Sequence, residues 1–130
     1  EQFDRVMHTN VLGAMQAIPQ VAPLVEAAQG RFAFISSELG RIGGVASSHT
    51  WLYRVSKAAL NMAVASAQHD YPRATLVALH PGWVQTDMGG AGAPLGVADS
   101  VRAMIRALDA LTPADRGRFL QHDGTPYACW

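Results

Sequence analysis

The chain has 130 residues, of which 49% are apolar and 15% are charged, and its formal net charge is zero. A chain this apolar is not typical of disorder, and its length suits one domain. Ten basic residues balance ten acidic ones, which argues against a nucleic-acid or anionic-membrane partner. No apolar run approaches the ~18 residues of a membrane span, and Cys129 is the single cysteine, so no internal disulfide is expected. These properties predict a cytoplasmic α/β protein.

The N-terminal segment predicts a helix that is followed by a buried strand. Apolar residues recur at three- and four-residue steps from Phe3 to Ile18, which is the period of an amphipathic helix. Pro19 and Pro23 lack a backbone N–H, so we expect a kink or a break near Ile18. Residues 31–36 are mainly apolar and are typical of a strand that is buried on both faces.

The rest of the chain alternates between helical and strand patterns. In chain order we expect a helix at 51–70, a buried strand at 74–79, a helix at 99–111 and a short strand at 118–121. Thr50 or Ser48 could cap the first of these helices. The second should turn four apolar residues inward, namely Val101, Met104, Ile105 and Leu108. This alternation, with continuous apolar strands, predicts a parallel sheet with helices on both faces.

Tyr53 and Lys57 form the sharpest local pattern. They are four residues apart on the expected helix and therefore share one face. Lys57 is the only lysine among ten basic residues, which suggests a role for a compact ammonium that arginine could not fill. An ammonium beside a phenol lowers the tyrosine pKa and would make Tyr53 a general acid or base for a carbonyl/alcohol pair. The same spacing also arises by chance on solvated helix faces.

Polar loops follow the two buried strands. Ser36 and Ser37 end the first strand, and the segment HPGWVQTD at 80–87 follows the second. Ligands of open α/β sheets bind at the carboxyl ends of the strands, so both loops should open on one edge. Alone, a serine pair at such a position is more often turn chemistry than catalysis.

Other patterns argue against competing sites. The glycines of 90–96 invite a dinucleotide-loop interpretation, but Pro94 interrupts them and no helix is expected to follow at once, so we interpret this segment as a mobile substrate-side loop. The five histidines have no metal-ligand spacing, so no metal site is expected. Four large apolar residues could line a substrate pocket or belong to the core: Trp51, Leu52, Trp83 and Met88.

Taken together, these motifs resemble the second half of a short-chain dehydrogenase/reductase over essentially the whole chain. The matching elements are TNVLG around Asn10, the FISS run, YRVSK and PGWVQT. The longer segments YRVSKAALNMA, HPGWVQTDMGG and DGTPYACW are similar to the carbonyl-reductase branch that contains the sniffer proteins and the bacterial C-factor group. The sixteen-residue step from Ser37 to Tyr53 resembles the longer loop of that branch.

The resemblance implies an α/β fold, the C-terminal part of a Rossmann-like doubly wound parallel sheet. Residues 1–130 would be a single partial domain, without the N-terminal glycine-rich part that binds the adenosine and pyrophosphate. The implied activity is hydride transfer between a nicotinamide cofactor and a small carbonyl or alcohol, with NADP favoured and NAD possible. We expect the chain to be inactive as an isolated fragment, and its central strand to present an unpaired apolar edge.

The resemblance also implies roles for individual residues. Tyr53 would give a proton to the carbonyl oxygen during reduction, and Lys57 would lower the tyrosine pKa and bind the nicotinamide ribose. Ser37 would polarise the carbonyl, with Ser36 as the fallback, and Asn10 would hold a water in the proton relay to Lys57. The loop that receives the nicotinamide carboxamide would contain Pro81, Gly82, Val84 and Thr86.

Two other functions stay open. The chain could be a non-catalytic fragment or interaction module, in which apolar faces of the helices at 3–28 and 51–70 serve assembly, as they would in a homodimer. It could also be an epimerase or dehydratase relative that uses the same YxxxK pattern. The PGWVQT loop and the short C-terminus make this last function less favoured.

Overall fold

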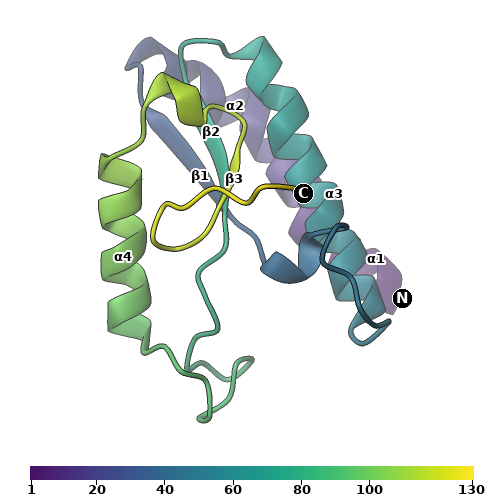
Figure 1. Cartoon of the computed structure of the whole chain (residues 1–130). Helices are drawn as coiled ribbons and strands as arrows, with labels where there is room; N and C mark the ends of the chain where they lie inside the picture. Colours follow the sequence, from purple (N-terminus) through teal and green to yellow (C-terminus); the bar gives the residue numbers. More distant parts are fainter.

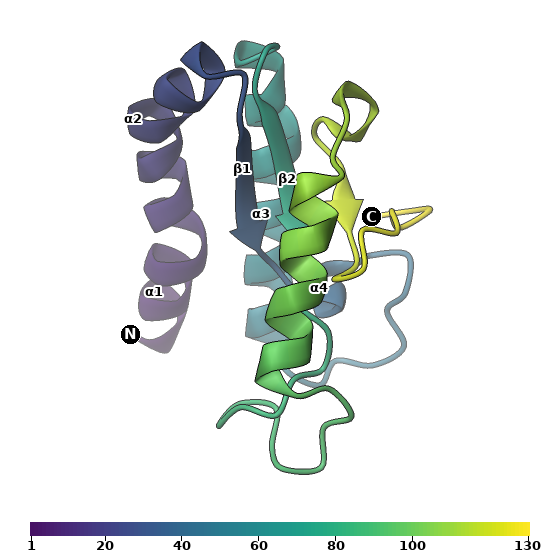
Figure 2. The same ribbon diagram turned by 90° about the vertical axis from the view of Figure 1, so that its left-hand side faces the viewer.

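The computed structural model describes residues 1–130 and places a three-stranded parallel sheet between two layers of helices (Figures 1 and 2). One face of the sheet is covered by α2 and α3, and the other by α4. The helices are α1 (Gln2–Met7), α2 (Gly13–Ala27), α3 (Trp51–Ala67) and α4 (Val97–Asp109), and the strands are β1 (Arg31–Ile35), β2 (Thr75–Leu79) and β3 (Phe119–Leu120). This arrangement confirms the predicted α/β fold class. None of the helices is long and apolar enough to cross a membrane.

The sheet has the order β1-β2-β3, so β2 lies in the middle. Ile35 of β1 is opposite Leu79 of β2, and Leu79 is also opposite Leu120 of β3. Because the three strands are parallel and in this register, their carboxyl ends meet at one edge. The unpaired edge that we expected on the central strand lies on β1 instead, whose outer edge has no partner strand within the chain, while β2 is paired on both sides.

Two apolar cores lie on the two faces of β2. Leu76 and Ala78 belong to the larger core, which includes Ile18 of α2 and Val64 of α3. Val77 and Leu79 alternate with them and pack with Leu120, Met104 and Leu108 on the side of α4. All five residues of β2 are buried, and all but Thr75 are apolar, as expected for a strand that is covered on both faces.

The expected break near Ile18 is wrong, because α2 runs through Pro19 and Pro23. Both prolines and Met15, the residue four before Pro19, are exposed, so water can satisfy the carbonyls that lose their N–H partners. The irregularity lies earlier instead, in a π-helical turn at His8–Leu12 that joins α1 to α2.

Two details of the other helices also differ from expectation. Val101 and Ile105 of α4 are exposed, whereas Ser100 and Ala107 are buried, so the helix turns Met104 and Leu108 but not Val101 and Ile105 toward the sheet. Thr50 precedes α3 in a left-handed conformation, with a φ of 55°. Its hydroxyl donates to the carbonyl of His49 and makes no cap, since an N-cap needs extended backbone.

Leu76 of the central strand is a fully buried member of the larger core. We expect Leu76→Ala, at a side chain with no exposed surface, to lower the free energy of unfolding by about 2–5 kcal/mol. Met88→Ala is the control, since Met88 is 84% exposed and its loss should change stability by less than about 0.5 kcal/mol. Urea unfolding followed by circular dichroism measures both, and equal midpoints for the two variants would contradict this core assignment.

Candidate active site at the carboxyl edge of the sheet

Tyr53 and Lys57 lie on one face of α3, as predicted, with the Lys57 Nζ 5.6 Å from the centre of the Tyr53 ring. The same Nζ donates a hydrogen bond of 3.1 Å to the carbonyl of Ile35, the last residue of β1. Burial lowers the pKa of Lys57 from its ordinary value of 10.5. The only lysine ammonium of the chain therefore lies between the tyrosine ring and the carboxyl end of a strand.

Ser36 and Ser37 follow β1 and are both buried, but their hydroxyls differ in what they bind. The Ser36 Oγ donates to Oδ1 of Asn61 at 2.6 Å, so its proton is already used. The Ser37 Oγ accepts from the N–H of Leu39 at 3.1 Å and donates to no group in the chain. This difference favours Ser37 over Ser36 as the hydroxyl that is free to donate to a ligand.

The turn that follows Ser37 packs directly on the helix that carries Lys57. It is a 3-10 turn, Glu38–Gly40, and a Cβ added to Gly40 would lie 2.9 Å from both the Cβ and the carbonyl carbon of Lys57. Only glycine allows this approach. The segment that carries the serine and the helix that carries the lysine are thereby held against each other.

Asn10 lies in the π-helical turn and reaches across to α3. Its Nδ2 donates to the Ser56 Oγ at 3.0 Å, and the Ser56 hydroxyl in turn donates to the carbonyl of Tyr53 at 2.8 Å. Ser56 has no exposed surface. The structure thus brings Asn10 to the turn of α3 between Tyr53 and Lys57, through a serine that the sequence analysis did not single out. π-helical turns are frequent at functional sites.

The loop after β2 contains a glycine that the fold requires. Gly82 has a φ of +88°, and a Cβ there would lie 2.7 Å from Leu95 and 3.2 Å from Nδ1 of His122. The carbonyl of Pro81 accepts from the Ser100 hydroxyl at 2.6 Å, which ties the loop to the start of α4. The predicted site residues of this loop therefore have fixed positions at the carboxyl edge.

The next residues are paired with the glycine-containing segment at 90–96. Val84 forms a parallel bridge with Leu95, and the Gln85 Nε2 donates to the carbonyl of Ala93 at 2.9 Å. The Thr86 Oγ1 accepts from the N–H of Gly89. The prediction that no helix follows this segment is wrong, since α4 begins directly after Gly96, where an extended glycine serves as its N-cap.

Three polar residues near this edge were missed in the sequence. Asn61 lies one turn after Lys57 and is 2% exposed, a position that the four-residue spacing of the tyrosine and lysine could have indicated. His80 and His122 each have a buried Nδ1 without a hydrogen-bond partner. Burial lowers the pKa of His80, the carboxylate of Glu38 opposes this change, and His122 reinforces it. His80 begins the HPGWVQTD loop, but no spacing in the sequence gave either histidine a role.

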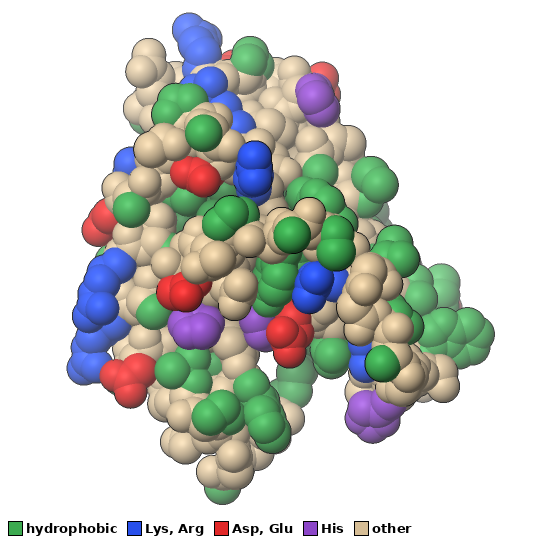
Figure 3. All heavy atoms as spheres, in the orientation of Figure 1, with side chains coloured by type: hydrophobic (Ala, Val, Ile, Leu, Met, Phe, Trp, Pro, Cys, Tyr) green, Lys and Arg blue, Asp and Glu red, His purple; other side chains and the backbone are tan.

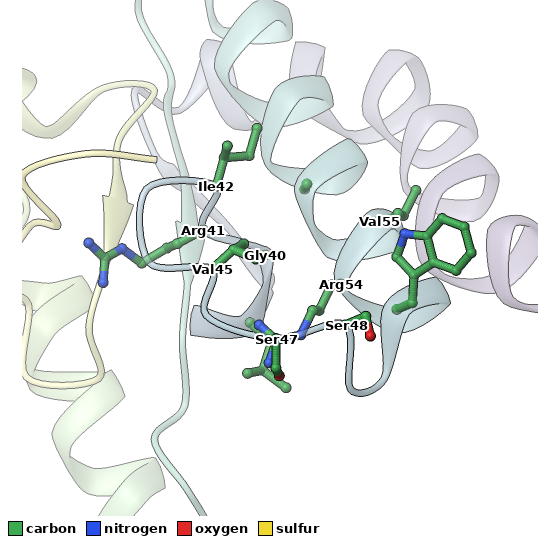
Figure 4. Close-up of a pocket in the computed structure, with 11 residues that line it drawn as sticks. Gly40, Arg41, Ile42, Val45, Ser47, Ser48, Arg54 and Val55 are labelled. Atoms are coloured by element: carbon green, nitrogen blue, oxygen red, sulfur yellow. The ribbon is translucent and has the colours of Figure 1, made fainter.

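A cavity of about 550 Å³ lies between the loop after Gly40 and α3 (Figure 4). Its lining includes Arg54 and also Trp51 and Val55, and by helical spacing the last two lie on the side of α3 opposite to Tyr53. None of the predicted catalytic residues lines it. Trp51, Trp83 and Met88 are 73%, 60% and 84% exposed, so the interpretation of these three residues as core is wrong.

Comparisons with known proteins agree with this geometry. A family model for short chain dehydrogenases matches residues 1–93. The chain is 44% identical over 124 residues to C-signal of Myxococcus xanthus, and this alignment covers 93% of the chain and 75% of C-signal. It is 32% identical over 127 residues to 1-hydroxy-2-glutathionyl-2-methyl-3-butene dehydrogenase of Rhodococcus sp., covering 93% and 56% of the two chains.

Solved structures of similar fold include carbonyl reductases. Carbonyl reductase Sniffer of D. melanogaster superposes with a TM-score of 0.89 at 36% identity, covering 95% of this chain and 55% of that one. The NADPH-bound carbonyl reductase from chicken fatty liver gives 0.86 at 31% identity, covering 98% and 57%. The chain thus spans three quarters of C-signal and a little over half of the other three proteins. On this evidence the chain belongs to the short-chain dehydrogenase family.

Proposed function

We propose that this chain carries the catalytic residues of an NADP-dependent oxidoreductase that interconverts a small carbonyl compound and its alcohol, with Tyr53 as the acid/base. The observation that carries the proposal is the convergence of Tyr53, Lys57 and Ser37 at the carboxyl edge of the sheet. Family membership and the carbonyl reductases of similar fold support it. Because the chain spans little more than half of those reductases, we also propose that turnover needs segments outside these 130 residues.

The residues at this edge fit a nicotinamide cofactor. The N–H of Val84 donates to no backbone or side-chain acceptor in the chain, so it is available to a carboxamide oxygen. Gly82 and Pro81 fix the start of the same loop, and Lys57 is near enough to the edge to bind a ribose hydroxyl. NADP is the cofactor bound by a carbonyl reductase of Pseudomonas aeruginosa with a similar fold. When bound, such a cofactor supplies or accepts the hydride.

The chain's own residues would handle the proton and the substrate oxygen. The Ser37 hydroxyl, whose proton is free, would donate a hydrogen bond to the carbonyl oxygen and polarise it. Tyr53 would then give its phenolic proton to the same oxygen, and the Lys57 ammonium would stabilise the phenolate by charge attraction. Asn10 uses its Nδ2 on Ser56, while its Oδ1 accepts no bond within the chain and could hold the water that returns the proton.

Tyr53→Phe tests the acid/base role. In the natural full-length protein we expect kcat for carbonyl reduction to fall by about 10²–10⁴-fold, because the proton donor is lost. Tyr71→Phe is the matched control, since Tyr71 lies at the opposite end of α3, before β2, and should leave kcat unchanged. Loss of NADPH absorbance measures turnover, and circular dichroism checks the fold. An active Tyr53→Phe protein would refute the assignment.

The burial of Lys57 predicts how it titrates. With lysine-selective ¹³C labelling of the 130-residue chain, the single lysine signal should titrate below its ordinary pKa of 10.5. The unfolded state then binds more protons than the folded state between the two pKa values, so stability rises with pH across that window. Lys57→Met should remove this rise, as measured by urea unfolding at a series of pH values. A titration at or above 10.5 would contradict the burial of the ammonium.

A second function, assembly through the helices at 3–28 and 51–70, is favoured by their exposed apolar side chains. Met15, Leu24 and Met62 are 53%, 72% and 69% exposed, and Figure 3 shows hydrophobic side chains along the side of the molecule where α1 and α3 lie. We propose that these helices form a homodimer, which would exist with or without catalysis. Burial of such a patch is favourable because it removes apolar surface from water.

Met62→Glu tests this assembly, because it places a charge in the proposed interface. Sedimentation velocity should show the wild-type chain as a dimer and the variant as a monomer. Met88→Glu is the control, since Met88 is as exposed but lies outside these helices, and it should stay dimeric. A monomeric wild type would refute the homodimer.

A further inference from the structure

Ser36 and Asn61 form the only fully buried hydrogen bond between two side chains of this chain. The Ser36 Oγ donates to the Asn61 Oδ1 at 2.6 Å, and the residues are 3% and 2% exposed. The Asn61 Nδ2 is buried without a partner. A buried amide with an unused donor costs stability, and the hydrogen bond to Ser36 satisfies only the oxygen of the Asn61 amide.

The hydrogen bond between Ser36 and Asn61 lies beside the candidate active site. Asn61 lies one helical turn after Lys57, and the two side chains bind consecutive residues at the end of β1. Lys57 binds the carbonyl of Ile35 at 3.1 Å, and Asn61 binds the hydroxyl of Ser36. The next residue along the chain is Ser37. The two contacts thus form a clamp from α3 onto the strand end, one residue before the proposed catalytic hydroxyl.

Little else holds this strand end on its outer side. The edge of β1 that faces away from β2 has no partner strand within the chain. On the inner side the N–H of Ser36 donates to the carbonyl of Leu79, and after Ser37 the close approach of Gly40 to Lys57 fixes the following turn. The hydrogen bond to Asn61 is therefore the contact that ties Ser36 to α3, the helix that carries the tyrosine and the lysine.

We propose that Asn61 is a positioning residue, which acts through Ser36 to hold the Ser37 hydroxyl at a fixed place relative to Tyr53 and Lys57. This inference rests on the proposed function. Asn61 does not touch the reacting atoms. Its effect arises because proton donation and carbonyl polarisation both need the substrate oxygen to lie within hydrogen-bond reach of two groups at once.

The test compares Asn61→Ala, Ser36→Ala and the double variant with a structural control. Gln68→Ala is the matched control, because Gln68 is also a buried amide but binds Tyr71, Ala74 and Leu76 at the other end of α3. It makes more hydrogen bonds than Asn61, so Gln68→Ala should destabilise the protein at least as much. A purely structural role for Asn61 therefore predicts the larger loss of activity in Gln68→Ala.

The first readout does not depend on activity. The amide of Leu39 donates to the Ser37 Oγ and that of Gly40 to the Ser37 carbonyl, so both report on this turn. We expect amide hydrogen exchange at these two positions to accelerate by about tenfold or more in Asn61→Ala and Ser36→Ala, relative to the change at distant helical amides. In Gln68→Ala the same two amides should keep their protection. Unchanged exchange in Asn61→Ala would overturn the proposal.

The second readout is kinetic. In the full-length protein we expect kcat to fall about tenfold or more in Asn61→Ala and Ser36→Ala, with the KM for NADPH within about twofold of wild type. The double variant should lose no more than either single variant, since both remove one interaction. Additive losses, or a faster-exchanging turn with unchanged kcat, would overturn the positioning role. If Tyr53→Phe stays active, the proposed function itself fails, and the exchange data still show whether Asn61 holds the turn.

Discussion

The contact between α3 and the carboxyl end of β1 is the constraint on which the candidate site depends. The Lys57 Nζ donates a hydrogen bond to the carbonyl of Ile35. Gly40, in the turn after Ser37, packs against the backbone and Cβ of the same lysine. A residue larger than glycine would push the turn away, because a Cβ would lie 2.9 Å from Lys57. With the turn in place, Ser37 and Tyr53 come from segments sixteen residues apart and share one edge.

This contact also places polar groups where water is scarce. The Lys57 ammonium, the Ser36 hydroxyl and the Asn61 amide are all partly or fully buried, and burial disfavours charge and unpaired donors. The chain offsets part of that cost with hydrogen bonds to backbone and to neighbouring side chains. The apolar cores on the two faces of β2 stabilise the fold and offset the remaining cost of burying these polar groups.

Much of the fold and the site could be predicted from local patterns. The positions of β1, β2 and α3 follow from apolar runs and helical spacing, and the tyrosine and lysine share a face because four residues make about one turn. The errors occurred where exposure decides the outcome. Pro19 is tolerated in α2 because it lies on the solvent side, and Val101 of α4 is exposed while the smaller Ser100 and Ala107 of the same helix are buried.

The sequence by itself determined the element types, the family and the identity of the candidate residues, because these depend on residue type and on spacing along the chain. Only the tertiary structure decided which hydroxyl is free and which is used. The family resemblance preferred Ser37 and kept Ser36 as the fallback, and the structure separates them because Asn61 accepts the hydroxyl proton of Ser36. Side chains of adjacent residues in an extended segment point in opposite directions, so this choice depends on what α3 places against the strand end.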